Sequence, residues 1–148
     1  MAIRVPVRLA SIEAYIVQRH GSARQLSLME RRVMDEFAGL IVDDIQEAWP
    51  VDTGLSRLAF DWVLLSQVGT VGFDIINDVD YVEFIHRAGD ATRTPLWTTV
   101  IPAVIQGWAP RMLAALRRAI DRTEAGLRRT GSSFIDILQD PNFGRVAA

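Results

Sequence analysis

The sequence predicts an α+β fold in which two long helices pack on a small antiparallel β-sheet, with an arm at the C-terminus. Three observations lead to this prediction. Apolar residues recur at steps of three and four over 29–49 and again over 101–127, which is helical spacing, whereas they alternate over 60–75, as in a hairpin. The length of 148 residues fits one domain over 1–130, followed by an arm over 131–148.

The N-terminal residues predict a strand and then a short helix. Apolar residues at positions 3, 5, 7 and 9 alternate with Arg4, Pro6 and Arg8, which is the period of a strand. Pro6 has no backbone N–H to donate, so we expect this strand at the edge of a sheet. Helical spacing begins at Ser11, and Gly21 is a suitable residue to end the helix.

The first long helix is the strongest element of the sequence. Ser27 and Glu30 have the spacing of a capping box at its start. The apolar stripe that follows covers about six turns and consists of Met29, Val33, Phe37, Leu40, Ile41, Ile45 and Trp49. Acidic residues near its C-terminal end face the negative end of the helix dipole. We therefore expect a partner's positive charge close to that end.

A polar corner separates this helix from the hairpin. Pro50 ends the helix, because proline excludes the residue before it from the α region. Asp52 and Thr53 are good N-cap types, and Gly54 lets the backbone turn freely. We expect the corner formed by Pro50, Asp52, Thr53, Gly54 and Arg57 to be structural.

The chain beyond the corner predicts a hairpin, a short helix and a second long helix. Two strands join near 68–70, and a ribbon of two strands needs the long helix or a neighbouring chain to cover its apolar face. Asn77 closes the second strand. A short helix over 81–88 would place Tyr81, Phe84, Ile85 and Ala88 on one face and pair Glu83 with Arg87.

A polar loop over 91–99 precedes the second long helix, which starts near Ile101. We expect Pro110 to kink this helix and Thr130-Gly131-Ser132-Ser133 to end it. Its outer face is rich in arginine: Arg111, Arg117, Arg118, Arg122, Arg128 and Arg129. This face could meet phosphates. Because no aromatic residues are interleaved with the arginines, we favour contact with an acidic protein surface.

Composition narrows the function classes. The chain has no cysteine and two histidines, which leaves no thiolate chemistry and little for a zinc site. The net charge of −2 gives no general affinity for nucleic acid, but residues 1–90 carry −6 and residues 91–148 carry +4. No apolar run is long enough to span a membrane, and no signal-peptide core is present, so we expect the protein to stay in the cytoplasm where it is made.

Three groups of residues give weaker support to an enzymatic function or a metal site. Asp52-Thr53-Gly54 matches the triplet of retroviral-type aspartic proteases, in which two chains share a carboxylate dyad, but it follows a helix and not a strand. His86 could act as a base, although no serine or cysteine is placed beside it as a nucleophile, and His20 fits a helix end. Asp43, Asp44 and Glu47 could hold a divalent cation, but a solvated helix face is the favoured interpretation.

The order of these features resembles the neck or tail-completion proteins of tailed bacteriophages, a family that includes head–tail joining proteins and minor tail components. The resemblance covers about residues 26 to 125 and rests on Pro50, Asp52, Thr53, Gly54, Arg57, Asn77, Tyr81, Phe84, Ile85, His86, Gly89, Pro95, Trp97, Pro102 and Ala103. Gly89 comes one residue later than in the family, and Asp90 replaces the usual threonine.

The resemblance implies a structural virion protein without catalytic residues, metal or cofactor. Such a protein would form a homo-oligomeric ring, commonly six-fold, at the head–tail junction, after assembly in the host cytoplasm. It would contact the connector or stopper, the tail terminator and the tail tube, and genomic DNA would pass it without sequence-specific contacts. Tail completion, tail terminator and portal adaptor remain alternatives, and the aspartic protease is a distant one.

Heterologous contacts between an acidic and a basic part can close into a ring. We therefore expect the arginine face over 111–129, or the arm, to contact the acidic part of an adjacent subunit. The candidate interface residues are Tyr81, Phe84, His86, Arg87, Trp97, Arg111, Arg117, Arg118 and Arg122.

Overall fold

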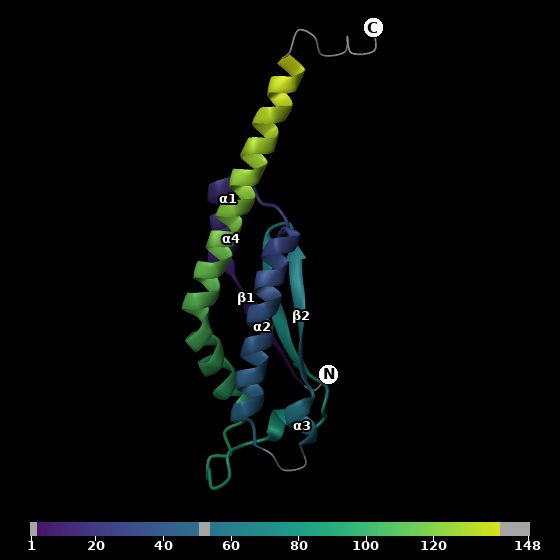
Figure 1. Cartoon of the computed structure of the whole chain (residues 1–148). Helices are drawn as coiled ribbons and strands as arrows, with labels where there is room; N and C mark the ends of the chain where they lie inside the picture. Colours follow the sequence, from purple (N-terminus) through teal and green to yellow (C-terminus); the bar gives the residue numbers. More distant parts are fainter. Residues whose placement is uncertain (1–2, 51–53, 140–148) are drawn as a thin grey trace.

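The structure is a computed structural model that describes residues 3–50 and 54–139, with residues 130–139 described as backbone alone. It is an α+β fold: a three-stranded antiparallel sheet with helices packed on it, and a long C-terminal helix (Figure 1). The predicted fold class is therefore confirmed. No helix among the residues described is both long and apolar enough to cross a membrane.

The sheet has the strand order β1-β3-β2. The hairpin strands β2 (Phe60–Gln67) and β3 (Thr70–Asn77) pair antiparallel, as predicted. The N-terminal strand β1 (Ile3–Arg8) pairs antiparallel with the other side of β3. β1 is thus an edge strand, in agreement with the missing N–H of Pro6.

Within the described residues, four α-helices accompany the sheet. α1 (Ala10–His20) ends at Gly21, whose φ of +91° is left-handed, and α2 (Leu28–Ala48) begins with the predicted capping box, since both bonds between Ser27 and Glu30 are present. α3 (Leu55–Leu58) is a short helix that the sequence did not predict. α4 (Val100–Gln139) runs alongside α2 and α1 (Figure 1).

α2 covers one face of the sheet. The Trp62 ring from β2 lies against Gly39 of α2, where a Cβ atom would sit 3.4 Å from the ring, and Trp62 Nε1 donates to Asp35 Oδ1 at 2.8 Å. The inner face of the sheet and one side of α2 are both hydrophobic, and they pack against each other here. Their burial holds the hairpin on the long helix, which is one of the two covers that the sequence predicted.

The apolar stripe predicted for α2 is buried as expected at Ile41, Ile45 and Trp49, but it is displaced over the rest of the helix. The side chains that α2 buries are Glu30, Met34, Ala38, Ile41, Val42 and Ile45. Met29 and Leu40 are exposed, whereas Phe37 is half-buried and packs edge-on against Trp108 of α4. The reason is that α2 is covered on two sides, by the sheet and by α4, so the most buried line lies between the two apolar faces.

The short helix predicted over 81–88 is wrong. Only a 3-10 turn, η1 (Val82–Phe84), forms there, followed by extended chain. Ile85 accepts a hydrogen bond from the N–H of Leu96, in the second 3-10 turn η2 (Leu96–Thr98), and His86 forms a β-bridge with Pro95. This pairing straightens the backbone after Phe84, so the predicted Glu83–Arg87 helical pair does not form. Val82 is the fully buried residue of the turn.

The predicted break at 130–133 is also wrong, because α4 continues through it to Gln139. A single glycine in a helix costs only about 1 kcal/mol relative to alanine. A helix already nucleated over eight turns adds further residues cooperatively and tolerates that cost. The predicted arm therefore begins inside α4, and its last residues, 140–148, lie outside the part of the chain that the structure describes.

Candidate functional site

The corner after α2 is held by backbone contacts. Gly54 has a φ of +79°, the left-handed conformation that glycine adopts at little cost, and it starts α3. Arg57 of α3 donates from Nε to the Gln46 carbonyl near the end of α2 at 2.6 Å. Arg57 thus places a positive charge of the same chain near this helix end, where the sequence led us to expect the charge of a partner. Asp52 and Thr53, predicted as caps, lie outside the described residues.

Asn77 joins the corner to the segment after the hairpin. Its side chain is fully buried at the end of β3. The amide nitrogen donates to the Ser56 carbonyl in α3 at 2.7 Å, and Oδ1 accepts from the N–H of Val79 at 3.0 Å. Both halves of the amide are therefore used, and one side chain fixes where α3 and the following turn lie.

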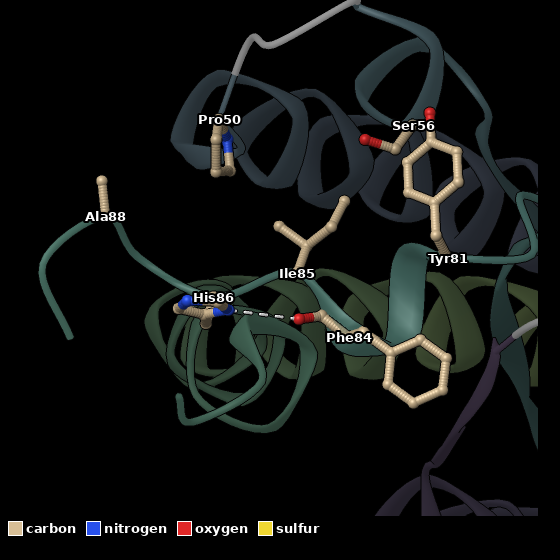
Figure 2. A pocket seen from close by; sticks show the side chains of 7 residues that line it. All are labelled: Pro50, Ser56, Tyr81, Phe84, Ile85, His86 and Ala88. Carbon is tan, nitrogen blue, oxygen red and sulfur yellow. Dashed lines mark hydrogen bonds between the residues drawn. The ribbon is translucent and has the colours of Figure 1, made fainter. Parts of the chain in front are cut away.

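A cleft opens between the corner and the turn that follows β3. Its volume is about 590 Å³, and its lining is mostly apolar. The lining residues are Pro50, Ser56, Tyr81, Phe84, Ile85, His86 and Ala88. Figure 2 shows Ile85 in the middle of this group, with Pro50 and Ser56 on the side of the corner. Three predicted interface residues and one corner residue, far apart in sequence, thus share one site.

The rim of the cleft exposes large apolar side chains. Phe84 is 70% exposed and Tyr81 is 44% exposed. α3 adds Leu55 and Leu58, which are also exposed, at the same end of the molecule (Figure 1). An apolar patch of this kind on a surface is typical of a contact with another macromolecule. Neither residue was singled out from the sequence, because α3 was not predicted.

The segment that carries Tyr81 and Phe84 is rich in acidic residues. Residues 78–90 carry Asp78, Asp80, Glu83 and Asp90 against the single arginine Arg87. Hydrogen bonds from the hydroxyl and N–H of Thr92, and from the N–H of Thr94, lower the pKa of Asp90. Residues 78–90 therefore carry a net negative charge at neutral pH.

His86 is one of the residues that line the cleft. Its Nδ1 is 3.4 Å from the Phe84 carbonyl (Figure 2). Trp97, predicted as an interface residue, lies in η2 and packs partly buried against the hydrophobic core. Arg87 is exposed, in agreement with a surface role.

The arginine face of α4 lies away from the cleft and divides into two parts. Arg111 stacks over the Trp108 ring at 4.0 Å, and Arg117 lies 5.9 Å from the Tyr15 ring of α1. These cation–π contacts hold two guanidinium groups against the fold. Arg118 and Arg122 are exposed and border a shallow depression between α4 and α2. Aromatic residues do accompany this face, which the sequence pattern did not predict.

The acidic cluster near the end of α2 is partly used inside the fold. Asp44 accepts a hydrogen bond from Trp108 Nε1 at 2.6 Å, which ties α2 to α4. Asp43 and Glu47 line a second depression with Arg57. Within 3–50 and 54–139, no three or more His, Cys, Asp or Glu residues gather where they could hold a metal ion.

A buried polar cluster, which the sequence did not predict, lies where α1, α2 and α4 meet. Arg24 donates two hydrogen bonds to Glu30, at 2.7 and 3.0 Å, and one to Glu124 at 2.9 Å. His20 Nδ1 lies 3.2 Å from Glu124. Both carboxylates are buried. The sequence signal was limited to the capping-box role of Glu30, because Glu124 lies 100 residues from Arg24.

Burial and hydrogen bonding shift the pKa values of the two carboxyl groups in this cluster in opposite directions. Burial raises the pKa of Glu30 and of Glu124, but hydrogen bonds from Arg24 to both, from the Ser27 N–H to Glu30 and from His20 to Glu124 lower them further. The net pKa of each carboxyl group lies below its ordinary value, and the pKa of Arg24 is raised. The cluster is charged at neutral pH and holds α4 on the α1–α2 connection.

The Asp-Thr-Gly triplet connects two helices. Trp49 ends α2 and packs edge-on against Phe60 with ring centroids 4.8 Å apart, and Gly54 begins α3. The aspartic-protease arrangement instead needs a strand on each side of its loop. Comparison of the chain with protein-family models, with curated proteins and with solved structures gave no match.

Proposed function

We propose that this chain is a structural component of a tailed phage or phage-like particle. It assembles into a ring at the head–tail junction and joins the connector to the tail. One observation carries the proposal. A single surface cleft is lined by Pro50, Tyr81, Phe84 and His86, which are among the residues on which the resemblance to neck proteins rests. Residues from separate segments that meet in an exposed apolar site form a binding surface, and that favours an assembly role.

The distribution of charge supports the same role. The cleft end is rich in carboxylates, whereas α4 carries arginines towards its C-terminal end. Opposite charges on different surfaces of one subunit favour heterologous contacts, which close into rings when each contact adds a fixed rotation. Arg118 and Arg122 are exposed and can form such contacts, while Arg111 and Arg117 also pack on their own fold.

Within this proposal, tail completion is the favoured position, and tail terminator and portal adaptor are the alternatives. The connector or stopper, the tail terminator and the tail tube are the proposed partners, and passing DNA would make contacts without sequence specificity. A ring of defined copy number, commonly six, is the shared expectation.

Negative-stain imaging and light scattering of the purified protein test this function. The expected result is a closed ring when the protein is as concentrated as it is during particle assembly. Changing Arg118 and Arg122 to glutamate should dissociate the ring in moderate salt, and changing Arg32, which lies on α2, to glutamate is the matched control. A protein that stays monomeric at all concentrations, or a peptidase activity that disappears with Asp52→Ala, would contradict the proposal.

A further inference from the structure

The last part of α4 leaves the body of the protein. Glu124 ties the helix to Arg24 and His20, and beyond it Ala125, Leu127 and Arg128 are exposed. Figure 1 shows the helix projecting past α1 as a single rod, from green into yellow. From Ala125 to Gln139 this rod is about 22 Å long, at 1.5 Å per residue.

The projecting part of α4 exposes an apolar residue. Nucleation by the preceding turns supports this part of the helix, but most helix stability in proteins comes from packing an apolar face. Leu113 and Ile120 pack on the core, and the next residue at the same seven-residue step, Leu127, is 47% exposed. The step after that falls on Phe134 in the sequence. The stripe that packs α4 on its own fold thus continues onto the projecting part.

The cleft lies at the other end of the molecule. Figure 1 places α3 and the chain after β3 at the end opposite to the C-terminal end of α4. A straight helix cannot bring its own last turns back to this cleft. The cleft is apolar and has the size of a site that takes a few side chains. Any helix end seated there must come from another molecule.

The charges of the two ends are complementary. Arg128 and Arg129 follow Leu127 directly, while Asp78, Asp80 and Glu83 are sequence neighbours of Tyr81 and Phe84, which line the cleft. The apolar stripe is thus followed by arginines, and the segment that lines the cleft carries carboxylates. Such matched potentials increase the association rate and select one orientation over another.

We infer that the projecting part of α4, residues 125–139, binds in the Pro50–Ser56–Phe84 cleft of a second copy of this chain. The contact is head to tail: each molecule gives its helix end to one neighbour and receives the helix end of another. This inference rests on the proposed function, because it names the surfaces through which the ring would close. It adds Leu127 and Phe84 to the exposed arginines of α4 as the apolar centre of the contact.

Two single variants and their mixture test the inference. Phe84→Asp impairs binding by the cleft and leaves the helix end intact. Leu127→Asp impairs binding by the helix end and leaves the cleft intact. Both side chains are exposed, so both variants should fold, as circular dichroism and thermal unfolding can verify. Val68→Asp, at an exposed apolar position in the hairpin turn, is the matched control.

Analytical ultracentrifugation should give a specific pattern. The wild-type chain and Val68→Asp assemble, whereas each interface variant alone self-associates at least tenfold more weakly. An equimolar mixture of the two variants forms a one-to-one heterodimer, because one intact cleft and one intact helix end remain. The inferred contact is overturned if the wild type assembles and either variant assembles equally well. It is also overturned if the wild type assembles and the two variants do not pair in the mixture. In both cases the proposed ring is not contradicted. A monomeric wild type would instead overturn both.

Cysteine trapping gives an independent readout, because the chain has no natural cysteine. A chain carrying both Phe84→Cys and Leu127→Cys should form intermolecular disulfides under mild oxidation and give a ladder of covalent oligomers on a denaturing gel. The pair Val68→Cys and Leu127→Cys should give at least tenfold less cross-linked product. Equal ladders from the two pairs, or none from the first pair in an assembled sample, would contradict the contact.

Discussion

Replacing Arg24 with methionine should destabilise the protein strongly. Arg24 bridges Glu30, which is 0% exposed, and Glu124, which is 5% exposed, through three hydrogen bonds of 2.7 to 3.0 Å. Methionine preserves much of the packing volume but leaves two buried carboxylates without their cation. Breaking a buried ion pair by removing one partner costs about 3–5 kcal/mol. That is a large share of a total stability of about 5–15 kcal/mol.

The pH dependence of stability should change sign in this variant. In the wild type both carboxyl groups have lowered pKa values, so their stabilisation is fully present above the unfolded pKa and is lost as pH falls through the folded pKa. Without Arg24, burial dominates and raises the pKa of each buried carboxyl group. The free energy of unfolding of Arg24→Met should then rise as pH falls from 7 to 5, while that of the wild type should stay level or fall.

Urea unfolding at several pH values measures both effects. Arg32→Met, which removes an exposed arginine from α2, should change the free energy of unfolding by less than about 0.5 kcal/mol. The double variant Arg24→Met, Glu30→Gln should recover part of the loss, because one buried charge is gone. The reasoning is refuted if Arg24→Met costs less than 1 kcal/mol and keeps the wild-type pH profile.

Three further substitutions test other parts of the fold. Gly72→Ala should cost about 1–3 kcal/mol in urea unfolding, because its Cβ would lie 2.1 Å from the Val7 carbonyl oxygen and push β1 away from β3; unchanged stability would show that β1 moves freely. Asn77→Ala should cost about 2 kcal/mol, because it leaves the Ser56 carbonyl and an amide of the following turn unpaired, whereas Asn77→Asp should retain only the acceptor role. Asp52→Ala should remove no peptidase activity, because the corner is expected to be structural; a loss of activity on a peptide substrate would favour the protease alternative.

The sequence was most informative where a structural signal is local. The capping box of Ser27 and Glu30, the edge position forced by Pro6 and the left-handed glycine after α1 each depend on a few neighbouring residues, and each is present in the structure. The hairpin was predictable for the same reason, since its alternation and its turn lie within eighteen residues. Local patterns of this kind remain valid in almost any tertiary context.

The predictions that failed depend on contacts between distant segments. The helix over 81–88 has good helical spacing, yet pairing of Ile85 and His86 with the loop around Pro95 overrides it. The buried line of α2 is shifted because a second helix covers it, and periodicity alone cannot show how many neighbours a helix has. The cluster of Arg24 and Glu124 joins residues 100 positions apart, so no spacing rule could predict it.

The candidate site shows the same division. Tyr81, Phe84 and His86 could be chosen from the sequence, but the expected helical face that was to unite them does not form. They meet instead because Asn77 fixes the turn against α3, which brings Pro50 and Ser56 to the opposite side of the cleft. Four of the lining residues, Pro50, Tyr81, Phe84 and His86, were therefore named from the sequence, whereas Ser56 and the reason for their proximity were not.

The buried cluster and the proposed contact are mechanically linked. Glu124 is the point at which Arg24 and His20 hold α4 before the helix projects from the body, so this cluster sets the direction in which Leu127 is presented. A ring closes only when every subunit adds the same rotation. A lever of about 22 Å converts a change of a few degrees at Glu124 into a displacement of one or two ångströms at its tip. A rigid, fully hydrogen-bonded anchor at this position is what a closed ring requires, whereas a flexible apolar anchor would allow subunits to join at variable angles and form open chains.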